Sequence, residues 1–114
     1  MHPIFKTQIS ILLWIQKTVY SKLRQKTDAS SVYLKCKSSS REGGTYNAKV
    51  YAAKTETSKK DDLSAGHTYK VGAGQTKRMI NKVNEKGYLY ACIQATRNYM
   101  YSSIFKNVWS PDSV

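Results

Sequence analysis

The sequence predicts an all-β protein, a single antiparallel β-sandwich of about seven short strands that spans residues 1–114. Several segments alternate apolar and polar residues with a period of two, which is typical of strands with one buried face. Nine of the thirteen aromatic residues are Tyr, a residue suited to half-buried strand positions. Turns rich in Gly, Ser and Asp separate these segments. The length of 114 residues predicts one domain with its own core.

The N-terminal segment is compatible with two structures. Residues 9–15 alternate as a strand does, although apolar positions in this region also recur at helical spacing. The β-branched residues favour a strand for 4–16, and a helix is the alternative. A second strand is predicted for Thr18–Lys26, followed by a turn in which Asp28 bonds to its own backbone.

The middle of the chain contains two clear strand patterns, Ser31–Ser38 and Tyr46–Lys54. A polar segment that ends in two glycines, residues 38–44, suits a hairpin connection between them. Residues 55–67 have no periodic apolar signal, so we expect a long exposed loop there.

The C-terminal half is less regular. Strands are predicted for Thr68–Gly72 and Tyr88–Thr96, whereas Gln75–Lys86 is compatible with one helical turn or an irregular strand. Apolar pairs at 104–105 and 108–109 indicate further strand near the end. The apolar faces of all these segments predict a core formed by Val32, Leu34, Val50, Val71, Leu89, Ile93 and Val108.

The charge of the chain is strongly positive, with 19 Lys and Arg residues against seven Asp and Glu residues and a formal net charge of +12. Such an excess favours polyanionic partners: nucleic acid, anionic lipid surfaces or phosphate-bearing wall polymers. The 15 lysines outnumber the four arginines, which favours diffuse electrostatic attachment over bidentate recognition.

The positive charge is patterned, because three predicted strands place Lys, Arg and Tyr on the face opposite their apolar residues. If these rows lie side by side, they form one basic sheet face with tyrosines. The predicted anion-binding residues are Lys22, Arg24, Lys26, Tyr33, Lys35, Lys37, Lys49 and Tyr51. An anionic polymer or a cell envelope is the expected partner, and nucleic acid stacked on Tyr20, Tyr33 and Tyr51 is the alternative. A merely solvated outer face would have the same pattern.

The two cysteines, Cys36 and Cys92, each lie in the middle of a predicted strand, and Tyr90 precedes Cys92 by two residues. In these positions residues 31–96 resemble an immunoglobulin-type sandwich, and the resemblance implies a disulfide between Cys36 and Cys92. The alternation argues against this bridge, because Cys36 shares its face with core residues whereas Cys92 lies on the more polar face of its strand, with Gln94. Two buried, unbridged thiols are the alternative.

The chain has short strands rich in Tyr, Lys and Ser, the late segment Gly87-Tyr-Leu-Tyr90, and the ending Val108-Trp-Ser-Pro-Asp-Ser113. In these features it resembles, over its whole length, small secreted β-sandwich proteins of Gram-positive bacteria, the group that includes lactococcin-type bacteriocins. The resemblance implies a secreted or surface location, with antibacterial activity as one form of the function. The N-terminus has no clear export signal, so a cytoplasmic location is the alternative.

No catalytic or metal-binding motif stands out. His67 is isolated in a loop, and Asp61 and Asp62 lie next to lysines that compensate their charge. Gly72–Gly74 lacks the spacing of a phosphate-binding P-loop. No segment approaches the roughly 18–20 apolar residues that cross a bilayer. We therefore expect a non-enzymatic binding protein that needs no cofactor or metal.

Overall fold

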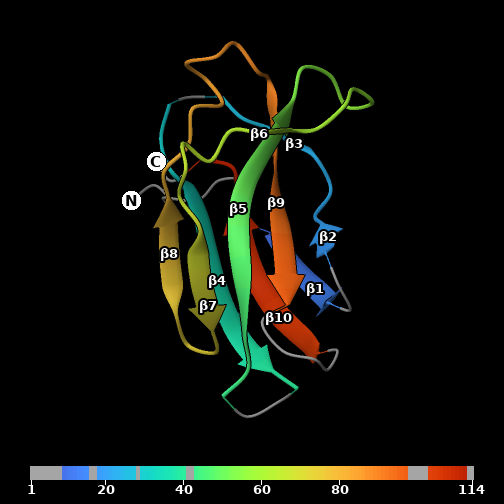
Figure 1. Cartoon of the computed structure of the whole chain (residues 1–114), viewed down its shortest axis with the longest axis vertical. Helices are drawn as coiled ribbons and strands as arrows, with labels where there is room; N and C mark the ends of the chain where they lie inside the picture. The colour runs from blue at the N-terminus through green and yellow to red at the C-terminus, as the bar shows by residue number, and fades with distance from the viewer. Residues whose placement is uncertain (1–8, 16–17, 28, 41–42, 98–102, 113–114) are drawn as a thin grey trace.

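The computed structural model describes residues 9–15, 18–27, 29–40, 43–97 and 103–112, and their strands form two antiparallel sheets (Figure 1). No helix occurs within these ranges, and the all-β prediction is confirmed. Sheet A contains four strands in the order β1 (Ile9–Ile15), β10 (Ser103–Ser110), β4 (Val32–Ser39) and β8 (Thr76–Met79).

Sheet B is built on two long central strands, β9 (Tyr90–Arg97) and β5 (Thr45–Ala53). In Figure 1 these two strands lie in front of β4 and β10 of sheet A. The free side of each central strand pairs with two short strands: β2 (Thr18–Tyr20) and β3 (Arg24–Gln25) along β9, and β7 (Tyr69–Gly72) and β6 (Asp61–Asp62) along β5. The described residues therefore form ten strands rather than about seven, because both edges of sheet B are divided.

The structure also decides between the alternatives that the sequence left open. Residues 9–15 form β1, paired along their whole length with β10, so a strand rather than a helix is correct there. The rest of the predicted segment 4–16 lies outside the described residues. In the ambiguous segment Gln75–Lys86, Thr76–Met79 forms the edge strand β8. Residues 83–87 form a turn, which the backbone N–H of Tyr88 closes by donating to the carbonyl oxygen of Val83 at 2.9 Å.

The core lies between the sheets and is formed by the inward rows of β4, β5, β9 and β10. At its centre the rings of Tyr46 and Phe105 pack edge to face, with centroids 4.7 Å apart. The Tyr46 hydroxyl donates to Asn107 Oδ1 at 2.8 Å, which gives this buried polar group the partner that it needs. Burial raises the pKa of Tyr46 well above its ordinary value, so the ring stays neutral.

The predicted core is correct at Val32, Leu34, Val50, Val71 and Ile93, all fully buried in this cluster. Val108 is also buried, but it lies outside the core cluster, since its neighbours on β10, Asn107 and Trp109, have their side chains in the interior. Leu89 is 56% exposed, and its prediction as a core residue is wrong. The last pair between β5 and β9 is Ala53 with Tyr90, so Leu89 lies beyond the end of β5, where its side chain is no longer covered.

The predicted loop 55–67 is not exposed throughout. Asp61 and Asp62 form β6 against Tyr51 and Ala52 of β5. The two residues that follow, Leu63 and Ser64, are buried. The 55–60 part is largely exposed, as expected.

The predicted strand Thr18–Lys26 is interrupted, and after the interruption its side chains lie on the opposite faces of the sheet from those that simple alternation predicts. Tyr20 pairs with Gln94 but Arg24 pairs with Ala91, so four steps along this segment match three along β9. One extra residue reverses the alternation of side chains. Tyr20 therefore lies on the outer face of sheet B, whereas Arg24 and Lys26 turn toward the opposite side.

Lys26 is 2% exposed and forms a buried ion pair with Asp112, with Nζ 3.0 Å from Oδ1. The same ammonium donates to the carbonyl oxygens of Ser30 and Pro111. The second carboxylate oxygen accepts hydrogen bonds from the backbone N–H of Thr27 at 3.0 Å and from its hydroxyl at 2.8 Å. This cluster joins the segment after β3 to the end of the chain after β10.

We predict that Asp112→Ala lowers the free energy of unfolding by about 3 kcal/mol, because it leaves the Lys26 ammonium buried without its counter-ion. Urea denaturation of the variant and the wild type measures this difference. The double variant Lys26→Met/Asp112→Leu removes both charges and should recover most of the loss. Equal stability of Asp112→Ala and the wild type would contradict the structural role of the pair.

Acid should weaken the same interaction. Burial alone would raise the pKa of Asp112, but the hydrogen bonds from Thr27 and Lys26 and the charge of Lys26 outweigh it and lower the pKa. An unfolded Asp has a pKa of about 3.9, so the unfolded state takes up this proton first and stability falls as the pH drops below about 4. We predict a shallower acid loss for Asp112→Asn, measured by urea denaturation across this range. A slope equal to that of the wild type would contradict the prediction.

Candidate binding surfaces

The three predicted basic rows do not form one continuous face. Tyr33, Lys35 and Lys37 belong to β4 in sheet A, whereas Lys49 and Tyr51 belong to β5 in sheet B. The sheets pack through their inner faces, so these two rows point away from each other. The alternation within each strand is as predicted, but the side-by-side arrangement is wrong because the strands enter different sheets.

The outer side of sheet A has a basic surface that we call the lysine face, formed by the exposed side chains Lys35, Lys37, Arg78 and Lys106. They come from three neighbouring strands, β8, β4 and β10. None of the four strands of sheet A contains an Asp or Glu residue. The register of β4 against β10 shifts at Lys106 and Asn107, which pair with Ser38 and Cys36. Lys37 is the extra residue of this bulge.

Tyr33 also lies on this side of sheet A but is only 7% exposed. The guanidinium of Arg78, its partner on β8, lies 5.6 Å from the ring centroid. The predicted role of Tyr33 as a stacking platform is therefore wrong, because its ring is covered.

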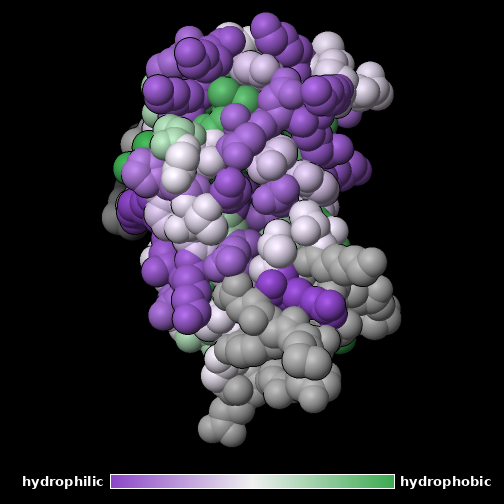
Figure 2. Space-filling model, viewed as in Figure 1, coloured by the Kyte–Doolittle hydropathy of each residue, from purple (hydrophilic) through white to green (hydrophobic). Residues whose placement is uncertain are grey.

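The outer side of sheet B has a different surface, which we call the tyrosine face: Tyr20, Lys49, Tyr51 and Gln94. Tyr20 and Tyr51 pack edge to face across β9, with centroids 5.4 Å apart. Gln94 Nε2 donates to the Tyr20 hydroxyl at 3.0 Å, and Lys49 Nζ lies 3.2 Å from Asp62 Oδ2. Figure 2 shows this side of the molecule, where hydrophilic side chains cover much of the described surface.

The remaining predicted anion-binding residues lie at the edge of sheet B. Lys22 is exposed, Arg24 is half-buried, and Lys26 is buried in its ion pair. The prediction for Lys26 is therefore wrong, since its three donors are already used by Ser30, Pro111 and Asp112.

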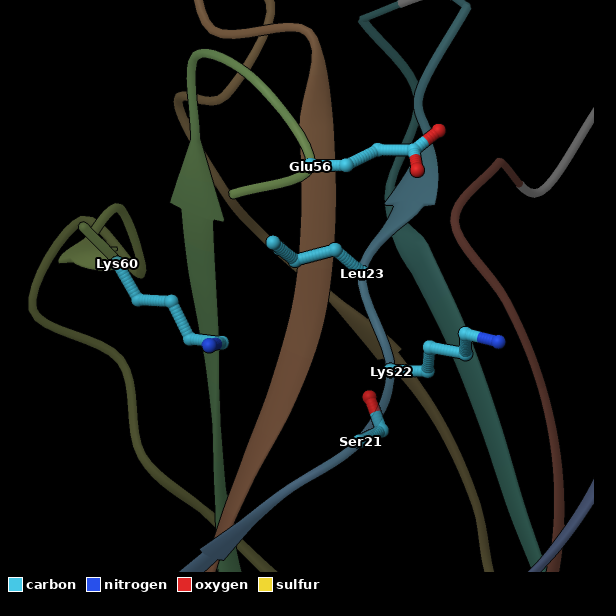
Figure 3. Close-up of a pocket in the computed structure, with 5 residues that line it drawn as sticks. All are labelled: Ser21, Lys22, Leu23, Glu56 and Lys60. Carbon is cyan, nitrogen blue, oxygen red and sulfur yellow. The ribbon is translucent and has the colours of Figure 1, made fainter. Parts of the chain in front are cut away.

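An open hollow of about 220 Å³ lies between the β2–β3 segment and the 55–60 loop, lined by Ser21, Lys22, Leu23, Glu56 and Lys60. A second hollow of about 320 Å³ adjoins it and reaches Arg24 and Tyr90. In Figure 3, Lys60 and Leu23 point toward each other, whereas the charged ends of Lys22 and Glu56 point the other way. These charged groups do not converge on one point as a catalytic pair would.

Cys36 and Cys92 are both free, and the disulfide implied by the immunoglobulin resemblance is not formed. Cys36 belongs to the core, whereas Cys92 pairs with Tyr51 and lies on the outer side of sheet B. The alternation of β9 thus turns the two thiols to different sides, as the sequence indicated. Burial raises the pKa of Cys36, and it raises the pKa of Cys92 to about 12 although the charge of Lys60 lowers it.

Within the described ranges, no group of three or more His, Cys, Asp or Glu side chains is placed to hold a metal ion. Asp61 and Asp62 are engaged locally: Asp62 with Lys49, and Asp61 with the Tyr88 hydroxyl at 2.8 Å and with Lys59 Nζ at 3.8 Å. Among the same residues, no helix has the length and apolar character required to cross a membrane.

Sequence reasoning did not include Arg78, Lys106 or Gln94 in the predicted binding face. Arg78 falls in the segment that could have been helix or strand, so its facing was undecided. Lys106 alternates with the buried Phe105 and Asn107, a signal that could have placed it on an outer face. The position of Gln94 between Tyr20 and Lys49 depends on the order of strands in sheet B, which the local pattern does not contain.

We predict that both thiols are unreactive toward Ellman's reagent in the folded protein, because burial disfavours the reactive thiolate. In concentrated guanidinium chloride without reductant, both cysteines should react. A denatured protein that releases no thiol until a reductant is added would contradict the free-thiol structure.

Both the fold and the sequence are similar to known ones. The fold is similar to that in the crystal structure of the Yersinia pseudotuberculosis-derived mitogen (YPM), with a TM-score of 0.54, 8% sequence identity, and coverage of 91% of this chain and 85% of that chain. At this identity the likeness shows the fold alone. No curated protein matches the sequence. Residues 7–113 match the family described as "Protein of unknown function (DUF2712)", and the chain belongs to that family.

Proposed function

We propose that this protein is a non-enzymatic binding module that attaches to an anionic polymer or a cell envelope through its lysine face. The observation that carries the proposal is the composition of sheet A. Four exposed cations come from three adjacent strands, and the strands of that sheet contain no acidic residue.

The spacing of the cations suits a repeating anionic chain. Side chains two residues apart on one face of a regular strand stand about 6.6 Å apart, and neighbouring strands lie about 4.8 Å apart. Arg78 pairs with Tyr33, two residues before Lys35, and Lys106 pairs with Ser38, next to Lys37. Each cation therefore lies about one Debye length or less from its nearest neighbour on this face (about 8 Å at physiological salt), so the positive potentials of neighbours add. A flat, additive potential favours a flexible polyanion over a compact ligand that needs a deep pocket.

The side-chain chemistry favours phosphate-bearing polymers over nucleic acid bases. Three of the four cations are Lys, which bind as point charges rather than as bidentate groups. Single-stranded nucleic acid binding typically adds aromatic rings on which bases stack, but Tyr33 on this side is covered by Arg78. The exposed Tyr20 belongs to the opposite sheet.

The secreted or surface location and the antibacterial activity rest on the sequence resemblance to small Gram-positive β-sandwich proteins, and we keep both as parts of this proposal. The likeness to the Yersinia mitogen supports the fold only, so the activity of that mitogen is not extended to this chain.

The test is a matched pair of charge-reversal variants. Lys35→Glu/Lys37→Glu/Lys106→Glu changes the lysine face, and Lys70→Glu/Lys82→Glu/Lys86→Glu makes the same charge change at exposed positions elsewhere. The probes are poly(glycerol phosphate), vesicles containing phosphatidylglycerol, and a single-stranded oligodeoxynucleotide. We predict that the first variant loses at least about tenfold in affinity for poly(glycerol phosphate), while the second loses much less. Thermal denaturation of both variants checks that they remain folded.

Salt provides the second measurement. Neutralising several phosphates releases counterions, so wild-type affinity should fall at least about tenfold between about 50 and 200 mM NaCl. Equal losses in the two variants, or a flat salt response, would contradict the proposal. Tighter binding to the oligodeoxynucleotide than to the polymer and the vesicles would favour a nucleic-acid-binding function instead.

A further inference from the structure

The tyrosine face contains one exposed aromatic ring that its neighbours hold in place. Tyr20 is 44% exposed, yet its ring packs against Tyr51 and its hydroxyl accepts a hydrogen bond from Gln94. Ring and amide therefore have a defined arrangement before any ligand binds. Pre-ordering of this kind lowers the entropy that binding must overcome.

The surroundings of Tyr20 are rich in uncharged hydrogen-bonding groups. Thr18, Thr96 and Asn47 pair across β2, β9 and β5, next to the row of Tyr20, Gln94 and Lys49. Hydroxyl and amide groups both donate and accept, as sugar hydroxyls do. Within the described residues, Tyr20 is the only largely exposed hydrophobic side chain on the strands of sheet B. This face therefore lacks the contiguous apolar area that marks a protein interface.

Two of the lysines near this face are paired with acidic residues, which lowers its positive charge. Lys49 is paired with Asp62 at 3.2 Å, and Lys59 lies 3.8 Å from Asp61. The strands of sheet A, in contrast, contain no acidic residue to offset Lys35, Lys37 and Lys106. A polyanion would gain less at sheet B than at the lysine face.

The hollow of about 220 Å³ continues the surface beyond Tyr20. Lys60 joins the two, since its Nζ lies 5.7 Å from the Tyr20 ring centroid and its side chain lines the hollow (Figure 3). That distance is near the outer limit of a cation–π contact, about 6 Å, so this contact holds the exposed Lys60 side chain only weakly. The hollow is open, and together with the adjoining hollow of about 320 Å³ it extends along the surface rather than enclosing a ligand. A chain lying along the surface fits this shape better than an isolated small molecule.

We infer that the tyrosine face binds a neutral, β-1,4-linked glycan chain, with one pyranose ring against Tyr20 and the next sugar in the hollow at Lys60. In such a chain the flat faces of each ring present C–H groups, which complement the negative π face of an aromatic ring. The ring-edge hydroxyls then lie beside Gln94 and Lys49. This inference does not rest on the proposed function, because it concerns the opposite face of the sandwich and an uncharged ligand.

The experiment titrates chitohexaose and cellohexaose into the ¹⁵N-labelled protein and follows amide chemical shifts. We expect shifts confined to 18–23, 47–51, 56–60 and 92–96 with at least one of the two sugars, unchanged when NaCl is raised to about 500 mM. Tyr20→Ala should weaken binding about tenfold, whereas Tyr20→Phe keeps the ring and should stay within about threefold of the wild type. The amide spectrum of each variant checks its fold.

The triple substitution of Lys35, Lys37 and Lys106 by Glu serves as a control that leaves the tyrosine face intact, and it should bind the sugar as the wild type does. Failure of polyanion binding would then leave this result unaffected. Absence of shifts with both sugars, shifts centred on other residues, or equal affinity of Tyr20→Ala and the wild type would overturn the inference. Loss of the shifts at high salt would also overturn it, because it would indicate an electrostatic contact.

Discussion

The rest of this structure depends on one constraint. Side chains alternate between the two faces of each strand, and the two sheets pack so that one face of each sheet is buried. Each central strand has one apolar row, and the two sheets bury these rows against each other. The second row of every strand must then face outward, on one of two opposite sides. The burial that stabilises the core thus also decides which lysines and tyrosines share a surface and which lie on opposite sides of the sandwich.

Much of this could be predicted from local pattern. The inward rows of β4 and β5 match the sequence alternation residue by residue, from Val32 to Cys36 and from Tyr46 to Ala52. The same rule placed Cys92 on the polar side of β9, away from Cys36, and so argued correctly against a bridge. Alternation is local information, because it depends only on which residues follow one another along a strand.

The partition of strands between sheets is a different kind of information. β4 and β5 are consecutive in the chain, yet β4 lies between β10 and β8, and β5 between β9 and the short edge strands. No local pattern distinguishes a hairpin within one sheet from a crossing between sheets, so alternation alone predicts a shared face for Lys35 and Lys49. The register change between Tyr20 and Arg24 is equally invisible in the sequence, since the extra residue exists only relative to β9.

Lys26 illustrates how such a change alters the chemistry of a residue. Lysine is almost never fully buried unless it is paired, and its sequence position among basic residues suggested a surface role. The reversed alternation turns Lys26 inward, where Asp112, 86 residues away, supplies the counter-ion. Another long-range polar contact, between Tyr46 and Asn107, lies in the interior of the sandwich. These contacts need defined partners, unlike apolar packing, and they connect parts of the chain that local patterns treat separately.

The two outer faces therefore follow from one packing rule but differ in chemistry. The strands of sheet A supply cations without acids, whereas sheet B combines paired charges with an ordered tyrosine and amide row. The sandwich measures 23 Å along its shortest axis, the direction in which the sheets are stacked. One flat surface cannot contact both faces at once, so two binding activities on this fold would engage different segments or different polymers. A composite envelope, in which anionic chains run beside neutral glycan, is the kind of material that such an arrangement could bridge.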